Sequence, residues 1–294
     1  MANSINTNYG ANIALQNLNA TNRALETTQN RINTGKAITS AKDNGAIWSI
    51  AQNQTTQMNA LDAVKQSLQR GQSTIDVAMA AGETVKDVLG QMKNLVLAAS
   101  DPGVDAASLD AYEEDFKNLA NQITTTIKGA SFNGVNMVAG ATATNAGKSL
   151  KALASADGKN TIDVAGVNFA FNTAGTAKQS INFVAADFTT AKGAADDAAR
   201  VTAMQNLMTD VDDSITYVTS SLTKLGTGSK SLDNQLTFTS KLQDTLETGI
   251  GNLVDADLAK ESAKLTALQT KQQLGVQALS IANSSSSVLL SLFR

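Results

Sequence analysis

Apolar residues recur every seven positions through two long stretches of the chain. The first runs from residue 61 to residue 99 and the second from residue 201 to residue 253. In each, a second apolar series follows the first by three residues, which predicts long helices that pack along a narrow seam. The first stretch carries Leu61, Leu68, Ile75, Gly82, Leu89 and Val96, followed by Val64, Gly71, Ala78, Val85, Met92 and Ala99.

A turn and a shorter helix follow the first long stretch. The run Ser100–Gly103 contains the only proline of the chain, which fixes φ, and a glycine that tolerates a reversal. Apolar residues at helical spacing then extend from Leu109 to Ile127. We expect this helix to fold back antiparallel onto the long one.

The two ends of the sequence carry narrower apolar stripes. Ile13 to Ile32 predicts one helix, and the acidic run Asp255-Ala-Asp257 is suited to capping another. Each helix would be marginal alone, so each needs a partner in its own chain or in another chain. We expect the two stripes to pair and then to meet the same pair in neighbouring subunits. The predicted interface residues are Ile13, Leu15, Leu18, Leu25, Ile32, Leu258, Leu265, Leu268, Leu279, Leu289, Leu290, Leu292 and Phe293.

A connector, which we call the spoke, interrupts the helical pattern after residue 31. Gly35 can end the first helix, and the polar cluster Thr39–Asp43 can begin the next. We expect the spoke to be packed because it carries large apolar side chains. Its predicted residues are Gly35, Ile38, Lys42, Asp43 and Trp48.

Residues 129–195 differ from the rest of the chain in being rich in glycine, threonine and alanine. The runs Thr161–Val164 and Val167–Phe171 flank Gly166 and predict a β-hairpin, and Ile181–Val184 is a third β-like run. The segment is too short and too weakly apolar to form a large independent domain.

The composition excludes several kinds of function. The sequence contains no histidine and no cysteine, so His-based catalytic pairs, thiolate metal sites and disulfides are absent. We therefore expect no catalytic residue, no metal and no cofactor. The net charge of −3 is spread without a basic block, which argues against nucleic acid. No apolar run is long enough to span a bilayer, and the first residues do not resemble a secretory signal peptide. These features alone favour the cytoplasm, although some export routes read other signals.

The predicted fold is mainly α: a long antiparallel helical rod with a small β-containing insert. We divide it into three parts. Residues 1–34 and 255–294 form an inner terminal coiled coil, residues 35–130 and 196–254 form the rod, and residues 131–195 form a short outer insert.

Four segments resemble the bacterial flagellins. Arg31–Asp43 resembles the family's spoke motif, and Ser131–Gly134 resembles its Phe-Asn-Gly element. Asp255–Gly275 and Ile281–Arg294 resemble its C-terminus closely. The short insert and Gly45–Trp48 are most similar to flagellins of alphaproteobacteria.

The resemblance implies a secreted structural subunit that polymerises into the flagellar filament for motility. It implies export in an unfolded state through the flagellum's own type III apparatus, and partners that include an export chaperone, the filament cap and the hook-junction proteins. Two other functions remain open at this point: a hook–filament junction protein and an intracellular coiled-coil adaptor. An electron micrograph and detection outside cells would separate them.

Two further expectations rest on the same resemblance. Flagellins sensed by the Toll-like innate receptor carry an Arg-rich segment in the long helix. Here that segment reads Gln91, Met92, Lys93, Asn94 and Leu95, which implies weak or absent recognition. Relatives also carry O-linked glycans, so exposed Ser or Thr side chains of residues 140–195 are candidates for glycosylation.

Overall fold

The computed structural model describes residues 8–140, 147–171 and 180–291, with side chains as far as Ser284 in the last stretch. Its elements are mainly helical, as the sequence predicts. In order they are α1 (Tyr9–Thr34), α2 (Ala41–Ala99), α3 (Ala106–Gly129), β1 (Leu150–Leu153), β2 (Thr161–Val164), α4 (Ala185–Lys192), α5 (Asp197–Val254) and α6 (Leu258–Ser291). The chain forms two compact units, Met1–Met58 with Asp244–Arg294, and Asn59–Gln243.

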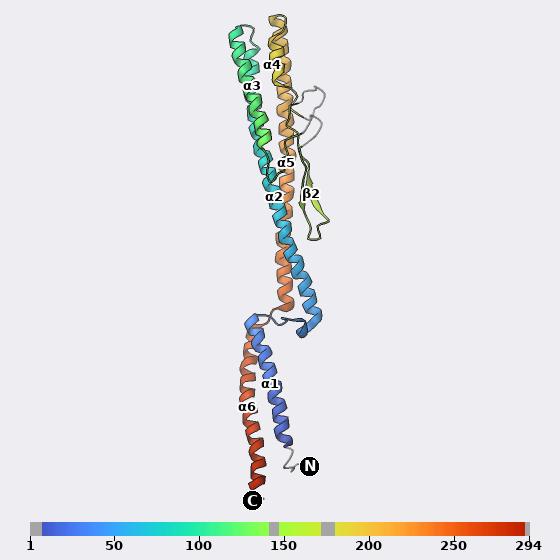
Figure 1. The fold of residues 1–294 in the computed structure, drawn as a ribbon, viewed down its shortest axis with the longest axis vertical. Helices are drawn as coiled ribbons and strands as arrows, with labels where there is room; N and C mark the ends of the chain where they lie inside the picture. The colour runs from blue at the N-terminus through green and yellow to red at the C-terminus, as the bar shows by residue number, and fades with distance from the viewer. Residues whose placement is uncertain (1–7, 141–146, 172–179, 292–294) are drawn as a thin grey trace. The chain divides into compact units, whose positions relative to one another are not determined.

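In the unit Asn59–Gln243, α2 and α5 pack antiparallel along their length (Figure 1). Contacts near the two ends of the shared stretch give the register. Lys93 Nζ lies 2.7 Å from Asp212 Oδ1, and Gln243 Nε2 donates to Asp62 Oδ1 over 2.8 Å. The predicted heptad positions of α2 from Leu61 to Ala99 are buried, which confirms the seam.

The buried face of α5 differs in part from the predicted seam. Val211, Val218 and Leu225 are fully buried as expected, but the series Met208, Ile215 and Leu222 is only half-buried. A different series is buried instead: Leu207, Ser214 and Ser221. The Ser214 hydroxyl accepts a hydrogen bond from the Asn182 backbone N–H, so this face meets the residues that follow the β-hairpin. A seven-residue apolar repeat identifies the coiled-coil seam, but it does not identify a second buried face that contains serines.

The turn after α2 forms as predicted, and α3 runs back along α2 (Figure 1). Asp105 caps α3, because its side chain accepts the Ser108 backbone N–H over 2.7 Å. Arg200, which is 4% exposed, closes the other side of the turn. Its guanidinium donates to the Ala99 carbonyl over 2.8 Å and to the Asp101 carbonyl over 3.3 Å. A cation therefore lies at the negative end of the α2 dipole.

The predicted hairpin exists, but its partner strand was wrong. The segment Thr161–Val164 pairs antiparallel with Leu150–Leu153 rather than with Val167–Phe171. Gly158, at φ 71°, belongs to the turn between the two strands. Val167–Phe171 instead bonds to backbone that precedes the strands, with Val167 N donating to the Met137 carbonyl over 2.7 Å. Ile181–Val184 leads into α4, and Ile181 makes only an isolated bridge with Phe171.

Three glycines of the long helices make room for this insert. A Cβ atom at Gly228 would stand 2.6 Å from Val164 Cγ1, and one at Gly82 would stand 2.7 Å from Leu222 Cδ2 of α5 as well as 3.1 Å from Phe169 Cε2. A Cβ atom at Gly71 would stand 3.2 Å from Leu150 Cδ2. The missing side chains let the insert approach the helix backbones closely, which is why glycine occupies helix interiors where it costs about 1 kcal/mol relative to alanine.

Aromatic packing fixes α4 and the segment before it onto α3. The ring centroid of Phe116 lies 5.1 Å from that of Phe188 and 5.7 Å from that of Phe183, and all three side chains are buried. Such tilted pairs stabilise by about 0.5–1.5 kcal/mol beyond the area they bury. The insert is therefore held against the helices both at the hairpin and at α4.

A buried carboxylate adds a polar contact beside these rings. Glu113 is 7% exposed and accepts hydrogen bonds from Lys117, Lys192 and Thr189. The hydrogen bond from Lys117, followed by those from Lys192 and Thr189, lowers the pKa of Glu113 to about 2. Lys192 also contacts Asp110, so one lysine of α4 meets two acidic residues of α3.

Candidate functional site

In the other unit, α1 and α6 lie side by side (Figure 1). They are antiparallel: Asn8 Nδ2 donates to the Ala282 carbonyl over 2.7 Å, and Gln272 Nε2 donates to Asn22 Oδ1 over 2.8 Å. The Asn8 side chain also caps α1 by accepting the Ala11 backbone N–H. The described part of the chain therefore pairs its two terminal helices with each other.

The facing side chains follow a seven-residue repeat on both helices. Most of the predicted stripe is half-buried in this contact, and a Cβ atom added at Gly275 would stand 3.2 Å from Leu18 Cδ1. The half-buried members of the predicted set are Leu18, Leu25, Ile32, Leu265, Leu268 and Leu279. A pair of single helices leaves each seam residue partly open to solvent.

Other apolar side chains of the α1·α6 pair face away from the seam. From the predicted set, Ile13 is 42% exposed, Leu15 45% and Leu258 50%. Sequence periodicity missed four more, namely Tyr9, Leu274, Val276 and Ile281, the last at 69% exposure. Leu274 and Ile281 lie seven residues apart, but on a different face of α6 from the predicted stripe of Leu265, Leu268 and Leu279. The register places residues 9–15 of α1 beside residues 277–283 of α6, and Leu274 and Val276 lie within one turn of that stretch, so all of these except Leu258 lie towards one end of the pair.

The last predicted interface residues lie at the edge of the described chain. Leu289 and Leu290 belong to the helical backbone of α6. Leu292 and Phe293 lie outside the described residues.

One polar cluster interrupts the apolar seam. Arg31 Nη1 lies 3.1 Å from Glu261 Oε1, and Thr28, one helical turn before Arg31, is fully buried. Burial of the Glu261 carboxyl raises its pKa, but the hydrogen bond from Arg31 and the nearby charges outweigh that effect and leave the pKa below its ordinary value. Glu261 is thus a charged group held in a largely buried position.

The spoke joins the return connection between α5 and α6 through backbone hydrogen bonds. Gly35 ends α1 in the left-handed region at φ 69°, and its carbonyl accepts the Ala256 N–H over 2.9 Å. The Ala37 N–H donates to the Val254 carbonyl over 2.7 Å. The two connections form a short antiparallel bridge between Lys36 and Asp255.

The polar part of the spoke is a compact turn closed by Asp43. Asp43 Oδ2 accepts the backbone N–H groups of Thr39 and Ser40, each over 3.0 Å, together with both hydroxyls. The bond from the Thr39 N–H, and then the others, lowers the pKa of Asp43. Asn44 has non-helical backbone angles and accepts the Ile47 N–H, so the continuous part of α2 starts after Asn44. Of the other predicted spoke residues, Ile38 is half-buried, whereas Lys42 and Trp48 are exposed.

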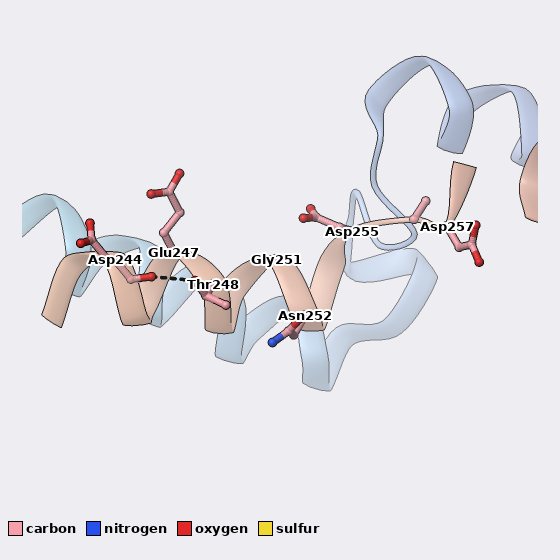
Figure 2. A pocket seen from close by; sticks show the side chains of 8 residues that line it. Asp244, Glu247, Thr248, Gly251, Asn252, Asp255 and Asp257 are labelled. Carbon is pink, nitrogen blue, oxygen red and sulfur yellow. Dashed lines mark hydrogen bonds between the residues drawn. The ribbon is translucent and has the colours of Figure 1, made fainter. Parts of the chain in front are cut away.

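A hollow of about 770 Å³ lies at the C-terminal end of α5 and is lined by four acidic side chains. They are Asp244, Glu247, Asp255 and Asp257, which Figure 2 shows projecting separately along the helix end. Asp257 is committed to capping α6, since its Oδ1 accepts the Ala259 and Lys260 N–H groups. Over the described residues, no group of acidic side chains is placed to hold a metal ion.

The segment of α2 with the altered receptor motif borders α3. Gln91, Asn94 and Leu95 line one side of a groove of about 440 Å³, and Asp115, Asn118, Leu119 and Gln122 of α3 line the other. Lys93 points to a different neighbour, because its ammonium pairs with Asp212 of α5. In the described chain, no helix is both long enough and apolar enough to cross a membrane.

Long paired helices that still expose apolar side chains at one end define a subunit of a self-associating helical assembly. Residues 5–143 match the bacterial flagellin N-terminal helical region, and residues 208–293 match the bacterial flagellin C-terminal helical region. Flagellin FljK of Caulobacter vibrioides is 52% identical over 298 residues, covering 99% of each chain. The flagellin of Brucella melitensis is 37% identical over 292 residues, again covering 99% of each.

The chain belongs to the bacterial flagellins, the subunits that polymerise into the extracellular flagellar filament for motility. It is a structural protein without enzymatic activity. A solved structure of a proposed flagellar hook-associated protein from Vibrio parahaemolyticus shares the fold, with a TM-score of 0.57 at 15% identity, and covers 72% of this chain and 100% of that one.

Proposed function

We propose that filament assembly depends on the apolar side chains that the α1·α6 pair leaves exposed. In this proposal the half-buried seam residues hold the two helices together. The outward residues Ile13, Leu15 and Leu258 of the predicted set, with Tyr9, Leu274, Val276 and Ile281, contact neighbouring subunits. The main observation behind the proposal is that Ile281 is 69% exposed, although the opposite face of α6 packs against α1.

Burial of these side chains between subunits has a substantial driving force. Fully burying an exposed Ile, Leu or Val side chain stabilises by about 1.5–3 kcal/mol, and these side chains, which are 42–69% exposed, would contribute roughly half of that each. Several such side chains per subunit would be covered, and the contact would repeat at every subunit of a polymer. A monomer gains nothing from keeping them in water.

Ile281→Asp tests the proposal directly. We expect Ile281→Asp subunits to remain monomeric while their circular dichroism matches that of the parent, because the substituted side chain lies outside the intramolecular seam. Ile281→Leu is the matched control and should assemble normally. Normal filament yield from both Ile281→Asp and Leu274→Asp would refute the assignment.

Truncation provides a second test. Removing residues 282–294 deletes the end of α6, including the predicted Leu289, Leu290, Leu292 and Phe293. We expect loss of filaments and retention of a folded helical unit from residues 59 to 243. Filaments of ordinary length from the truncated chain would contradict the role of this end.

Exposed apolar helices also suggest which partners act before and after assembly. An export chaperone would cover this surface in the cell, and the cap and the hook-junction proteins would meet it at the filament ends. The proposal keeps the three-part division of the chain and the role of the spoke as the connection between the inner coiled coil and the rod.

Two proposals concern the outer parts of the molecule. Replacement of the Arg-rich motif by Gln91, Lys93, Asn94 and Leu95 supports weak or absent recognition by the Toll-like receptor. O-linked glycans are proposed on exposed hydroxyls of residues 140–195, part of which (141–146 and 172–179) lies outside the described residues. An intact mass of 30.5 kDa for protein from native filaments would contradict glycosylation.

A further inference from the structure

Three polar side chains, which we call the polar layer, meet inside the apolar contact between α1 and α6: Thr28, Arg31 and Glu261. The Arg31 and Glu261 side chains are only 29% and 12% exposed, and Thr28 is 0% exposed. Arg31 Nε and Glu261 Oε2 are buried without a hydrogen-bond partner. The polar layer is therefore an incompletely hydrogen-bonded ion pair at the spoke end of the apolar seam, in the last turn of α1 and the first turn of α6, with the Lys264 ammonium 3.8 Å from Glu261 Oε2.

Stability alone does not explain the polar layer. A buried ion pair loses hydration on both partners, and well-packed apolar residues at the same positions are often as stable or more stable. The best-attested role of a polar group in a coiled-coil seam is to specify register and partner at a cost in stability.

The apolar seam by itself accepts a second register. In the structure, a Cβ atom at Gly275 would stand 3.9 Å from Leu18 Cβ, and one at Gly10 would stand 4.0 Å from Ala282 Cβ. A slide of α1 by seven residues towards the C-terminal end of α6 would bring Leu18 to Ala282 and Ile32 to Leu268. These two contacts would remain small or apolar.

The polar layer distinguishes the two registers. A seven-residue slide moves Arg31 about 10 Å along α6, away from Glu261. It would bury the guanidinium beside leucine and leave the carboxylate with only the Lys264 ammonium of its own helix, 3.8 Å away, which is unfavourable. Pairing α1 with another α1, or α6 with another α6, would likewise bring like charges together or leave them unpaired. Backbone bonds between Gly35 and Ala256 anchor the same register from the neighbouring end.

We propose that Thr28, Arg31 and Glu261 select α6 of the same chain as the partner of α1 and fix the register of the pair. This inference rests on the proposed assembly role of the pair. The inference concerns which helices pair within a subunit, whereas the proposed function concerns which exposed side chains contact neighbouring subunits.

The absence of cysteine from the sequence makes the register directly measurable. Leu18→Cys with Gly275→Cys would place two Cβ atoms 3.9 Å apart, close to the roughly 3.8 Å of natural disulfides. Leu18→Cys with Ala282→Cys reports the slipped register instead. Each pair is introduced into the full chain, which is assembled, oxidised, dissolved and run on a non-reducing gel. A disulfide within one chain keeps the monomer mass, and a disulfide between chains doubles it.

In the parent sequence we expect the 18–275 disulfide to form within single chains and the 18–282 disulfide to be at least tenfold less abundant. Adding Arg31→Leu with Glu261→Leu should raise the 18–282 product at least tenfold. Adding Glu26→Leu with Lys271→Leu, which removes one charge of each sign from exposed positions of the same two helices, should not. An unchanged 18–282 product without the polar layer, or dimeric 18–275 product in the parent, would overturn the proposal.

If the variant with Arg31→Leu and Glu261→Leu does not assemble, exchanging the two charges provides a second test. Lys264→Gln is included in both arms, because the Lys264 ammonium lies 3.8 Å from the Glu261 carboxylate and would repel an arginine there. Arg31→Glu should reduce filament yield at least tenfold, and Arg31→Glu with Glu261→Arg should recover at least half of it. Equal loss in both arms would refute pairing through this contact. The disulfides can also be read in soluble chains, so a failure of Ile281→Asp to block assembly leaves this test intact.

Discussion

Two glycines in one turn of α5 provide a sharp test of how the insert is held. Gly226 and Gly228 both lie within the α5 helix. A Cβ atom at Gly226 would meet nothing within 4 Å, whereas one at Gly228 would stand 2.6 Å and 3.0 Å from the two Cγ atoms of Val164. The same substitution at the two positions therefore separates helix propensity from packing against the hairpin.

Gly226→Ala should stabilise the protein. Alanine is favoured over glycine in a helix interior by about 1 kcal/mol, which corresponds to about 2–4 °C in the unfolding midpoint for a unit of this size. Gly228→Ala has the same propensity gain but must displace Val164, whose β-branched side chain has few alternative rotamers. Overpacking of this kind costs about 1–3 kcal/mol, so we expect Gly228→Ala to be neutral or destabilising by up to about 2 kcal/mol.

The measurement is thermal unfolding of soluble subunits followed by circular dichroism, with Val164→Ala completing the cycle. Val164→Ala should be better tolerated in the Gly228→Ala background than in the parent, with a coupling energy of about 1 kcal/mol or more. If Gly228→Ala stabilises the protein as much as Gly226→Ala does, the hairpin does not occupy this position and the reasoning is wrong.

Three other predictions concern the same unit. The pKa of Glu113 is lowered from 4.5 to about 2, so its contribution to the free energy of unfolding is present above pH 4.5 and is lost as the pH falls towards 2. Glu113→Gln should therefore flatten the dependence of the unfolding midpoint on pH between pH 4.5 and 2. Arg200→Leu leaves the carbonyls at the end of α2 without their donor and should lower the free energy of unfolding by about 1.5–3 kcal/mol in urea titrations, while a change at the exposed Lys230 should have little effect. Cells reporting on the Toll-like receptor should respond weakly to the parent and more strongly to Gln91→Arg with Asn94→Glu; full activity of the parent would contradict the proposed loss of recognition.

The long helices could be predicted from the sequence because their seams repeat over many turns. The heptads of α2, the Pro102 turn and the end of α1 at Gly35 all follow from local rules, and the structure has each of them. Pairing of the two terminal stripes in one chain was also accessible, since neither helix would be stable alone.

The insert and the outward surface could not be predicted in the same way. Leu150–Leu153 lacks β-branched residues, whereas Val167–Phe171 is rich in apolar and aromatic residues, so propensity chose the wrong partner for Thr161–Val164. Leu150 instead packs over Gly71, a contact between residues distant in sequence that propensity does not include. Ile281 and Leu274 were missed because they lie outside the predicted stripe of α6, on a face that remains exposed.

The β1–β2 hairpin packs on Gly71 and Gly228, so its inner and outer faces tolerate amino-acid substitution differently. Leu150 and Val164 are buried against helix backbone, whereas Lys151 and Asp163 form an exposed pair on the outer side. Substitutions at the outer positions, or a peptide inserted in the exposed turn at Asp157–Gly158, leave every contact with the helices in place. The hairpin is therefore a position where a filament surface can be relabelled, or can diverge between strains, without altering the helices that carry it.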